Sequence, residues 1–422
     1  MKKQTWLLLL TGLLGLSLLA GCAPAAATGV DMMEGITPAP APADEPVPEA
    51  YTAAMAGFGW HLLRSSASNE GSLLVSPASV HLALSMTLNG TDTETREQML
   101  ALLGNASLDV EQLNRAARLA LARWNEPRED DRLTIANSIW FDQAFEPDPD
   151  FLQANADHFA AAARKLDFHS DEALDAINGW VKEATRGLIP SVLNRIPADA
   201  VMYLVNAIHF QADWLEPFAK TATRARTFHA PDGEVEADFM HRNGSMQYLQ
   251  DEDMTGVLLP YKGERFAFFA ILPDEQTSPR DLLASRGDAD LQAFVEALQS
   301  NTTQTEVDLA LPRFEVSYQD SLVDELTAMG MERAFDPAQA DFSLLQTSRL
   351  KNLYISDVIH KTFCRVDEKG TEAAAVTAVE ISKTSMPAPG QALVFDRPFL
   401  YGIVDLDSTL PLFLGILENP TA

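Results

Sequence analysis

The sequence predicts an α+β fold in which helices pack against large β-sheets. Segments with apolar residues at helical spacing dominate the first third of the chain after residue 50, and strand patterns dominate the remainder. Strands and helices do not alternate as a parallel α/β sheet requires. No second low-complexity linker and no internal repeat divides residues 50–422, so this range is predicted to be one large domain.

The N-terminus has the features of an export signal. Lys2 and Lys3 precede an apolar run over residues 6–20, as in a secretory signal peptide. The run closes with Leu-Ala-Gly-Cys at residues 19–22, which resembles a bacterial lipobox and predicts lipidation of Cys22. An ordinary signal peptide with an incidental cysteine is the alternative interpretation.

Cleavage at the lipobox would remove residues 1–21 and leave the lipid on Cys22. Residues 22–49 are rich in Ala, Pro and acidic side chains, which predicts an extended tether that holds the domain away from the bilayer. The protein is therefore expected outside the cell, anchored to the envelope at the outer membrane or the outer face of the plasma membrane. A diacylated cysteine is sufficient for stable anchoring.

The composition is that of a strongly acidic globular protein. The chain has 60 Asp and Glu against 31 Lys and Arg, a formal net charge of −29, and 46% hydrophobic residues. Such a surface repels nucleic acid, so no nucleic-acid partner is expected. We expect a monomer.

Each helix and strand follows from a local pattern. Ser76 followed by Pro77 is typical of a helix start, with serine as N-cap and proline in the first turn. Helices are predicted at 51–66, 76–88, 93–103, 110–124, 148–163, 174–185, 290–300 and 321–329. Strands are predicted at 72–75, 133–141, 201–210, 227–228, 235–240, 246–249, 256–260, 266–273, 306–316, 361–366, 394–404 and 411–417.

Residues 371–381 have the pattern of a strand between flanks typical of loops. With a period of two, one face carries only small, apolar or threonine side chains: Thr371, Ala373, Ala375, Thr377, Val379 and Ile381. The other face carries both glutamates of the run. The segment 385–390 that follows is rich in Pro and Gly. A strand that could join a sheet is one interpretation; a short Ala-rich helix and a flexible linker are the alternatives.

No catalytic or metal-binding motif stands out. The chain has no Gly-x-Ser-x-Gly elbow and no phosphate loop, and its eight histidines are scattered. Cys364 lies in the predicted strand 361–366 and is interpreted as a buried structural thiol. The sequence thus predicts no enzyme, no cofactor and no metal site.

Several motifs occur in a fixed order from about residue 51 to residue 420. They are 72–80, 204–210 with Trp214 and 217–218, His360-Lys361 followed by 367–375, and 397–400 with Gly415 and Asn419-Pro420. Together they resemble the serpin family of protease inhibitors. The resemblance implies helices packed on three β-sheets and an exposed reactive-centre loop.

The resemblance also implies a mechanism, that of a suicide-substrate inhibitor of serine endopeptidases, with cysteine endopeptidases as a further class. The protease cleaves the loop and forms an acyl-enzyme, and the cut loop inserts into the central sheet before deacylation. The family's usual spacing, counted from Glu368, places the reactive bond at Thr384–Ser385. A small residue there suits elastase- or subtilisin-like enzymes, and Lys383 offers an alternative bond to trypsin-like enzymes.

Further roles follow from the resemblance, residue by residue. The hinge comprises Glu368, Gly370, Thr371, Glu372, Ala373, Ala374, Ala375 and Thr377. The sheet-opening cluster comprises Ser76, Ser79, Asn206 and His360. The breach, where insertion begins, comprises Trp214, Arg313 and Glu368. Taken alone, His360 would be a satisfied core histidine and Glu368–Arg313 a surface salt bridge.

Two other functions are compatible with parts of the sequence. A non-inhibitory serpin, acting as a binding or carrier protein, usually has bulky or charged residues in its hinge, whereas the face of this hinge that carries Thr371, Ala373 and Ala375 has none. An envelope solute-binding lipoprotein would share the lipobox and tether, but it should show alternating strands and helices.

Overall fold

The computed structural model describes residues 29–40, 42, 45–126, 128, 130–198, 200–371 and 390–421. Its helices are α1 (Glu49–Ser66), α2 (Pro77–Leu88), α3 (Thr93–Gly104), α4 (Val110–Trp124), α5 (Pro149–Phe159), α6 (Asp171–Ala184), α7 (Pro279–Ser285), α8 (Asp288–Ser300) and α9 (Val323–Ala328). Its strands are β1 (Val30–Asp31), β2 (Leu73–Val75), β3 (Asp131–Asp142), β4 (Ala162–Leu166), β5 (Met202–Asp213), β6 (Arg224–Ala230), β7 (Gly233–Gln250), β8 (Met254–Pro260), β9 (Phe266–Pro273), β10 (Gln304–Pro312), β11 (Phe314–Ser321), β12 (Ile359–Val366), β13 (Gly370–Thr371), β14 (Gln391–Val394), β15 (Phe399–Asp405) and β16 (Leu410–Leu417).

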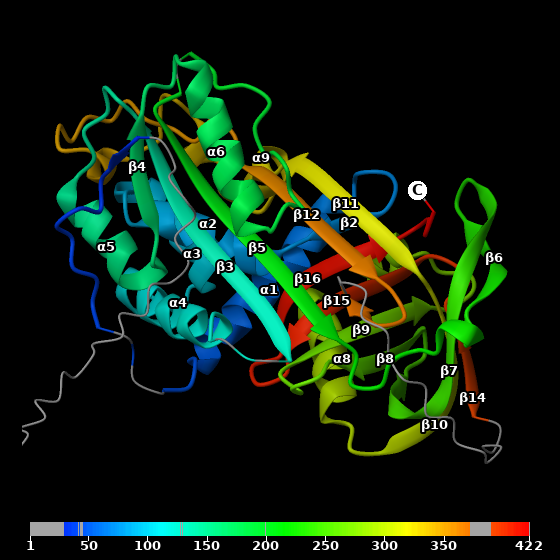
Figure 1. The fold of residues 1–422 in the computed structure, drawn as a ribbon. Coiled ribbons are helices and arrows are strands. Elements are labelled where there is room, and N and C mark those ends of the chain that lie inside the picture. The colour runs from blue at the N-terminus through cyan, green and yellow to red at the C-terminus, as the bar shows by residue number, and fades with distance from the viewer. Residues whose placement is uncertain are drawn as a thin grey trace, which may run out of the picture.

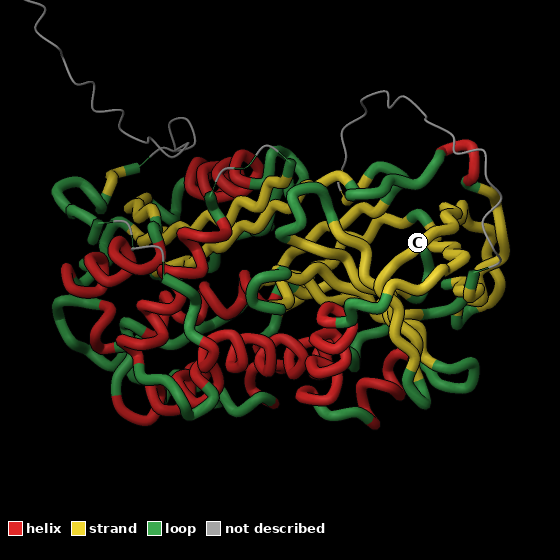
Figure 2. The backbone as a smooth tube through the Cα atoms, turned by 90° about the horizontal axis from the view of Figure 1, so that it is seen from below, coloured by secondary structure: helices red, strands yellow, loops and turns green. Residues whose placement is uncertain are grey.

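The strands form a seven-stranded and a nine-stranded sheet (Figure 1). The smaller sheet has the order β1-β4-β3-β5-β13-β12-β11, and the larger has the order β14-β10-β7-β8-β9-β15-β16-β2, with β6 paired to β7. Most helices gather on one side of the strands (Figure 2). The predicted α+β class is confirmed.

The third sheet of the prediction is continuous with the second. Residues 233–239 of β7 pair with β6, residues 239–247 pair with β10, and residues 247–250 pair with β8. This long strand therefore joins two sheet regions that the prediction treated as separate. It also replaces the two shorter predicted strands at 235–240 and 246–249.

Three other predicted elements end early or are divided in the structure. The predicted helix 148–163 ends at Phe159, because Ala160 adopts a left-handed conformation (φ 48°) and β4 follows. The predicted strand 306–316 is divided at Arg313 into β10 and β11, which belong to different sheets. The predicted strand 394–404 is interrupted before β15 by a segment that contains Pro398.

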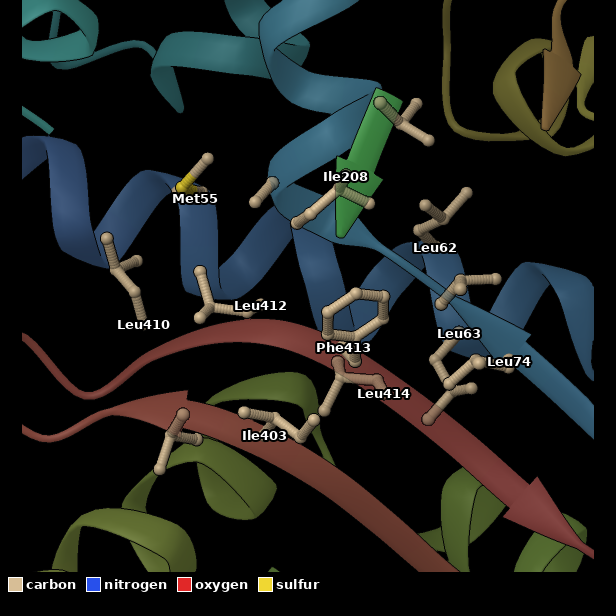
Figure 3. Packing of buried hydrophobic residues seen from close by; sticks show 14 of the residues in the cluster. Met55, Leu62, Leu63, Leu74, Ile208, Ile403, Leu410, Leu412, Phe413 and Leu414 are labelled. Carbon is tan, nitrogen blue, oxygen red and sulfur yellow. The ribbon is translucent and has the colours of Figure 1, made fainter. Parts of the chain in front are cut away.

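The main core lies between the smaller sheet and the last two strands of the larger one. Ile208 of β5, Leu62 and Leu63 of α1, and Phe413 and Leu414 of β16 belong to this buried cluster (Figure 3). The helix α2 runs through this layer, and Ser76 caps it as predicted by accepting a hydrogen bond from the Ser79 amide. Removing this apolar surface from water is the main stabilisation of the fold.

The opposite face of the smaller sheet is covered by α6. Trp180 and Ile177 of this helix pack on Trp140 of β3 and on Val205 and Ala207 of β5. The sheet is therefore buried on both faces around β5, as the apolar run 201–210 predicted. No helix within the described ranges is long and apolar enough to cross a bilayer.

Candidate functional site

The hinge begins inside the smaller sheet. β13, only Gly370 and Thr371, lies between β5 and β12: Thr371 pairs with Ala212 on one side and with Val366 on the other. A Cβ atom added at Gly370 would lie 2.0 Å from the Ala212 carbonyl oxygen. Glycine is therefore required for the hinge backbone to approach β5 this closely.

Trp214 holds the chain that leads into the hinge. Its indole Nε1–H donates to the Asp367 carbonyl and its amide donates to the Lys369 carbonyl, both at 2.8 Å. The ring is 1% exposed and is stacked on Tyr261, with centroids 4.6 Å apart. The structure thus brings Trp214 to the hinge, at the place where the sequence put the breach.

Glu368 and Arg313 are neighbours, but their ion pair is long. The closest atoms, Oε1 and Nη1, are 3.9 Å apart, whereas Arg313 donates to Asp238 at 2.8 Å. Glu368 is nearly buried and accepts a 2.8 Å hydrogen bond from the Thr223 hydroxyl. Because Arg313 is half exposed, its Coulomb contribution is small, and the hydrogen bond from Thr223 is the more specific contact.

Tyr261 contacts the hinge, a role that the sequence did not predict. Its hydroxyl lies 2.5 Å from the hydroxyl of Thr371, and both side chains are buried. Burial raises the pKa of Tyr261 well above its ordinary value, so the phenol keeps its proton for this contact. Tyr261 follows directly after a strand, a position that carries no sequence signal for such a role.

Beyond β13 the neighbouring strands continue without a strand between them. Over the described residues, β5 and β12 have no direct backbone pairing; only β13 joins them. A cavity of about 720 Å³ lies at the far end of this space, lined by residues 202–207, residues 359–361 and one side of α2. We call the space between β5 and β12 beyond Thr371 the slot.

A chain of polar side chains crosses the floor of the slot. The Ser76 amide donates to Nε2 of His360 at 3.0 Å, and the Ser79 amide donates to the Ser76 hydroxyl at 3.3 Å. The Ser79 hydroxyl donates to Oδ1 of Asn206, whose amide donates to Asn137 at 2.6 Å. The structure therefore brings the four predicted cluster residues together, from β12 through α2 to β5.

Asn137 extends this chain and was not predicted. It lies opposite Asn206 in the β3–β5 ladder and donates to the Phe159 carbonyl at 2.8 Å. An asparagine within the mainly apolar strand pattern at 133–141 was the available signal. The polar chain thus reaches from β12 to the end of α5.

His360 is neutral in this arrangement. Burial lowers its pKa to about 4, against a smaller opposing effect of Asp320, and Nε2 must be unprotonated to accept the Ser76 amide. Protonation would remove this acceptor and leave a buried cation at the floor of the slot.

The other end of the candidate loop is held by the larger sheet. β14 pairs in parallel with β10, with Gln391 opposite Val307. A Cβ atom at Gly390 would lie 2.7 Å from the Glu306 carbonyl oxygen, so this glycine also permits a close approach. The remaining predicted site residues lie outside the described residues: Cys22, Glu372, Ala373, Ala374, Ala375, Thr377, Lys383, Thr384 and Ser385.

Cys364 is buried, as the sequence predicted. In the described part of the chain, no group of three or more His, Cys, Asp or Glu side chains could hold a metal ion. Within the described residues, the site consists of a slot, its polar floor and two anchored loop ends.

Among the described residues, these features define a sheet in which two neighbouring strands, β5 and β12, are joined only by the two-residue strand β13. A family model described as "Serpin (serine protease inhibitor)" matches residues 53–420. An uncharacterized serpin-like protein of Thermococcus kodakarensis is 32% identical over 374 residues, covering 87% of this chain and 85% of that protein. The chain belongs to the serpin family, whose members are typically protease inhibitors.

Two solved structures relate this arrangement to others in the family. The native state of the thermophilic serpin tengpin has a TM-score of 0.85 at 36% identity and covers 93% of this chain and 99% of its own. The latent state of tengpin scores 0.77 at 35% identity and covers 89% of this chain and 100% of its own. The present structure is therefore more similar to the native state.

The family also includes members that are not inhibitors. Thyroxine-binding globulin in complex with thyroxine has a TM-score of 0.78 at 25% identity and covers 88% of this chain and 99% of its own. Fold similarity alone does not separate the two classes.

The lowered pKa of His360 predicts a loss of stability in mild acid. The unfolded state takes up the proton near pH 6.5 and the folded state only near pH 4, so stability present above pH 6.5 is lost as pH falls through this window, by up to about 3 kcal/mol. His81, buried with a pKa lowered to about 4, should contribute a similar loss.

Urea unfolding of wild type and His360→Gln at about pH 7.5 and about pH 5 measures this contribution. The variant should lose clearly less stability between the two pH values, because one of the two histidines whose pKa is lowered to about 4 is gone. An equal loss in both proteins would show that His360 does not titrate as its burial implies.

Proposed function

We propose that this protein is a suicide-substrate inhibitor of serine endopeptidases, with cysteine endopeptidases as a second class. The observation that carries the proposal is the slot between β5 and β12, with β13 at its start. β5 extends from Asp213 to Met202, and β13 occupies only the positions opposite Asp213 and Ala212. The sheet therefore has room for a strand that continues from Thr371.

The register of β13 defines which residue of β5 each residue of such a strand would pair with. Gly370 is opposite Asp213 and Thr371 is opposite Ala212, so continued antiparallel pairing sets Ala373 opposite Phe210, Thr377 opposite Asn206 and Ile381 opposite Met202. The end of β5 coincides with the end of the period-two run at residue 381. The run and the slot match in length.

The inward-facing side chains of the run also match the side chains of β5 and β12 that they would meet. On the β12 side, continued pairing from Val366–Thr371 sets Ala373 opposite Cys364 and Thr377 opposite His360. Cys364 and Phe210 are buried, so only a small side chain such as that of Ala373 would fit between them. Thr377, a polar residue on the inward face, would lie beside the polar side chains of Asn206 and His360, where a hydroxyl can find hydrogen-bond partners.

Insertion would stabilise the protein considerably. Roughly ten residues would gain ladder hydrogen bonds at about 1 kcal/mol net each, in addition to side-chain burial. A gain of this size, released after cleavage of the loop, could displace an acylated protease before deacylation. The uninserted state is correspondingly metastable.

The reactive bond is proposed at Thr384–Ser385, with Lys383 as the alternative P1 residue. The former suits elastase- or subtilisin-like proteases and the latter trypsin-like ones. We propose that the protein acts as a monomer and forms its partner complex only with the target protease. A non-inhibitory binding or carrier role is the second candidate, since such members exist in the family.

Incubation with an elastase-, a subtilisin- and a trypsin-like protease, followed by denaturing electrophoresis, tests the proposal. We expect a covalent band with the summed mass of protein and protease, because the acyl-enzyme is trapped. Cleavage of the loop by all three enzymes without such a band would instead support the non-inhibitory role. Mass spectrometry of the released peptide identifies the reactive bond.

Two neighbouring substitutions test the register. Ala373→Arg would bury an unpaired guanidinium between Phe210 and Cys364, at a cost of at least about 3 kcal/mol, which slows insertion more than ~100-fold. The protein should become a substrate, and the number of molecules consumed per protease inhibited should rise strongly.

Glu372→Arg is the matched control, because the same side chain would be on the opposite face beside the half-buried Gln211. Its stoichiometry of inhibition should stay near that of wild type. Equal effects of both substitutions would contradict the proposed register.

We also propose that Cys22 is lipidated and anchors the protein on the cell envelope, at the outer membrane or the outer face of the plasma membrane. The sequence Leu-Ala-Gly-Cys at residues 19–22 supports this proposal. One diacylated cysteine provides two acyl chains, which suffice for stable attachment.

Expression of Cys22→Ser in the native host tests the anchor. The variant should leave the membrane fraction and lose the lipid mass from its N-terminal peptide, whereas Cys364→Ser, the control for loss of a thiol, should remain in the membrane fraction. Unchanged membrane partitioning of Cys22→Ser would contradict lipidation.

A further inference from the structure

Residues 29–40, within the predicted tether, lie on the domain. Val30 pairs with Lys165 and Asp31 with Arg164, so β1 covers the outer edge of β4. The Met32 amide then donates to the Ala163 carbonyl at 2.9 Å. In Figure 1 this blue segment follows the end of the molecule that contains β4 and α5. We call residues 29–40 the strap.

The second half of the strap is attached to α5. The Ala39 amide donates to the carboxylate of Asp157 at 2.6 Å, and the side-chain amide of Gln153 donates to the Thr37 carbonyl at 3.0 Å. Met32, Met33 and Ile36 are half-buried against the main core. Backbone pairing, side-chain hydrogen bonds and apolar contacts thus hold the strap along its length.

This docking shortens the stretch of chain between Cys22 and the domain. Between Cys22 and Gly29 the chain can span at most about 25 Å, whereas a tether that was free up to Glu49 could span about 95 Å. The prediction of a tether that holds the domain away from the bilayer therefore differs from the arrangement of the strap. An anchor at Cys22 would act almost directly on the β4 edge.

The strap is also far from the ends of the reactive loop. β4 and β14 lie at opposite ends of the long axis of the molecule (Figure 1). An anchor that pulls on the β4 edge would therefore leave the β14 end directed away from the membrane.

We infer that the strap fixes the orientation of the anchored protein, with its β4–α5 end within about 25 Å of the bilayer and its loop end toward the medium. This inference rests on the lipidation of Cys22 proposed above. It implies that the partner is a protease that approaches from solution. A protease held close to the same membrane would face the β4–α5 end of the molecule and not the reactive loop.

Neutron reflectometry on a supported bilayer measures this geometry directly. The chain from Cys22 to Ala422, carrying Cys364→Ser, would be coupled through Cys22 to a maleimide phospholipid, so the measurement requires neither native lipidation nor inhibition. We expect a water gap no wider than about 25 Å between the bilayer and the protein layer.

Met32→Asp/Ile36→Asp should release the strap by charging its buried face, and the gap should widen about twofold, as expected for the longer flexible chain. Asp157→Ala, which removes only the acceptor of the Ala39 amide at the far end of the strap, leaves β1 paired with β4 and should keep the narrow gap. The matched control Thr37→Asp/Pro40→Asp adds the same charge at exposed positions and should keep the narrow gap.

A wild-type gap clearly wider than about 25 Å, or the same gap in the released and control variants, would overturn the inference. Failure of Cys22→Ser to leave the membrane in cells would instead contradict the native anchor, and absence of a covalent protease band would contradict inhibition. The three results are independent of one another.

Discussion

The smaller sheet is held together across the slot by a two-residue strand and a chain of polar side chains. β13 pairs with both neighbours only at its first positions, and below it β5 and β12 are connected through Ser76 and Ser79 of α2. Apart from the two-residue edge strand β1, every other described strand in this sheet has longer backbone pairing on at least one side. The slot is therefore the place where the sheet can separate with the smallest loss of backbone hydrogen bonds.

The polar floor suits such a site for a physical reason. An apolar floor would favour complete closure over the slot, because buried apolar surface gains from every additional contact. Hydroxyl and amide groups can instead exchange partners: Asn206 now bonds Ser79 and Asn137, and His360 accepts from Ser76. An incoming strand could offer Thr377 to these groups while the interior stays hydrogen-bonded.

Local patterns in the sequence were sufficient to predict most of the helices and strands. The Ser76-Pro77 helix start, the covered strand around residues 201–210 and the strand-like run at 371–381 all depend on neighbouring residues, and the first two appear in the structure as predicted. The division at Arg313 follows Pro312, a local signal that the predicted strand 306–316 did not take into account, whereas the two sheets to which β10 and β11 belong depend on distant partners.

Contacts between residues that are far apart in the sequence could not be predicted either. Tyr261 meets Thr371 across 110 residues, and the strap meets β4 through backbone groups that any sequence could supply. The cluster of Ser76, Ser79, Asn206 and His360 was found through resemblance to a family, because nothing in their separate surroundings predicts that they meet. Its neighbour Asn137 was missed for the same reason.

The central claim is that the uninserted sheet is metastable and that a cut loop stabilises it by insertion. Thermal unfolding before and after cleavage of the loop by a protease that the protein does not inhibit tests it most directly. The account predicts that the nicked protein, with both fragments still associated, melts at least about 10 °C higher than the intact one. An unchanged or lower melting temperature after complete cleavage would contradict it.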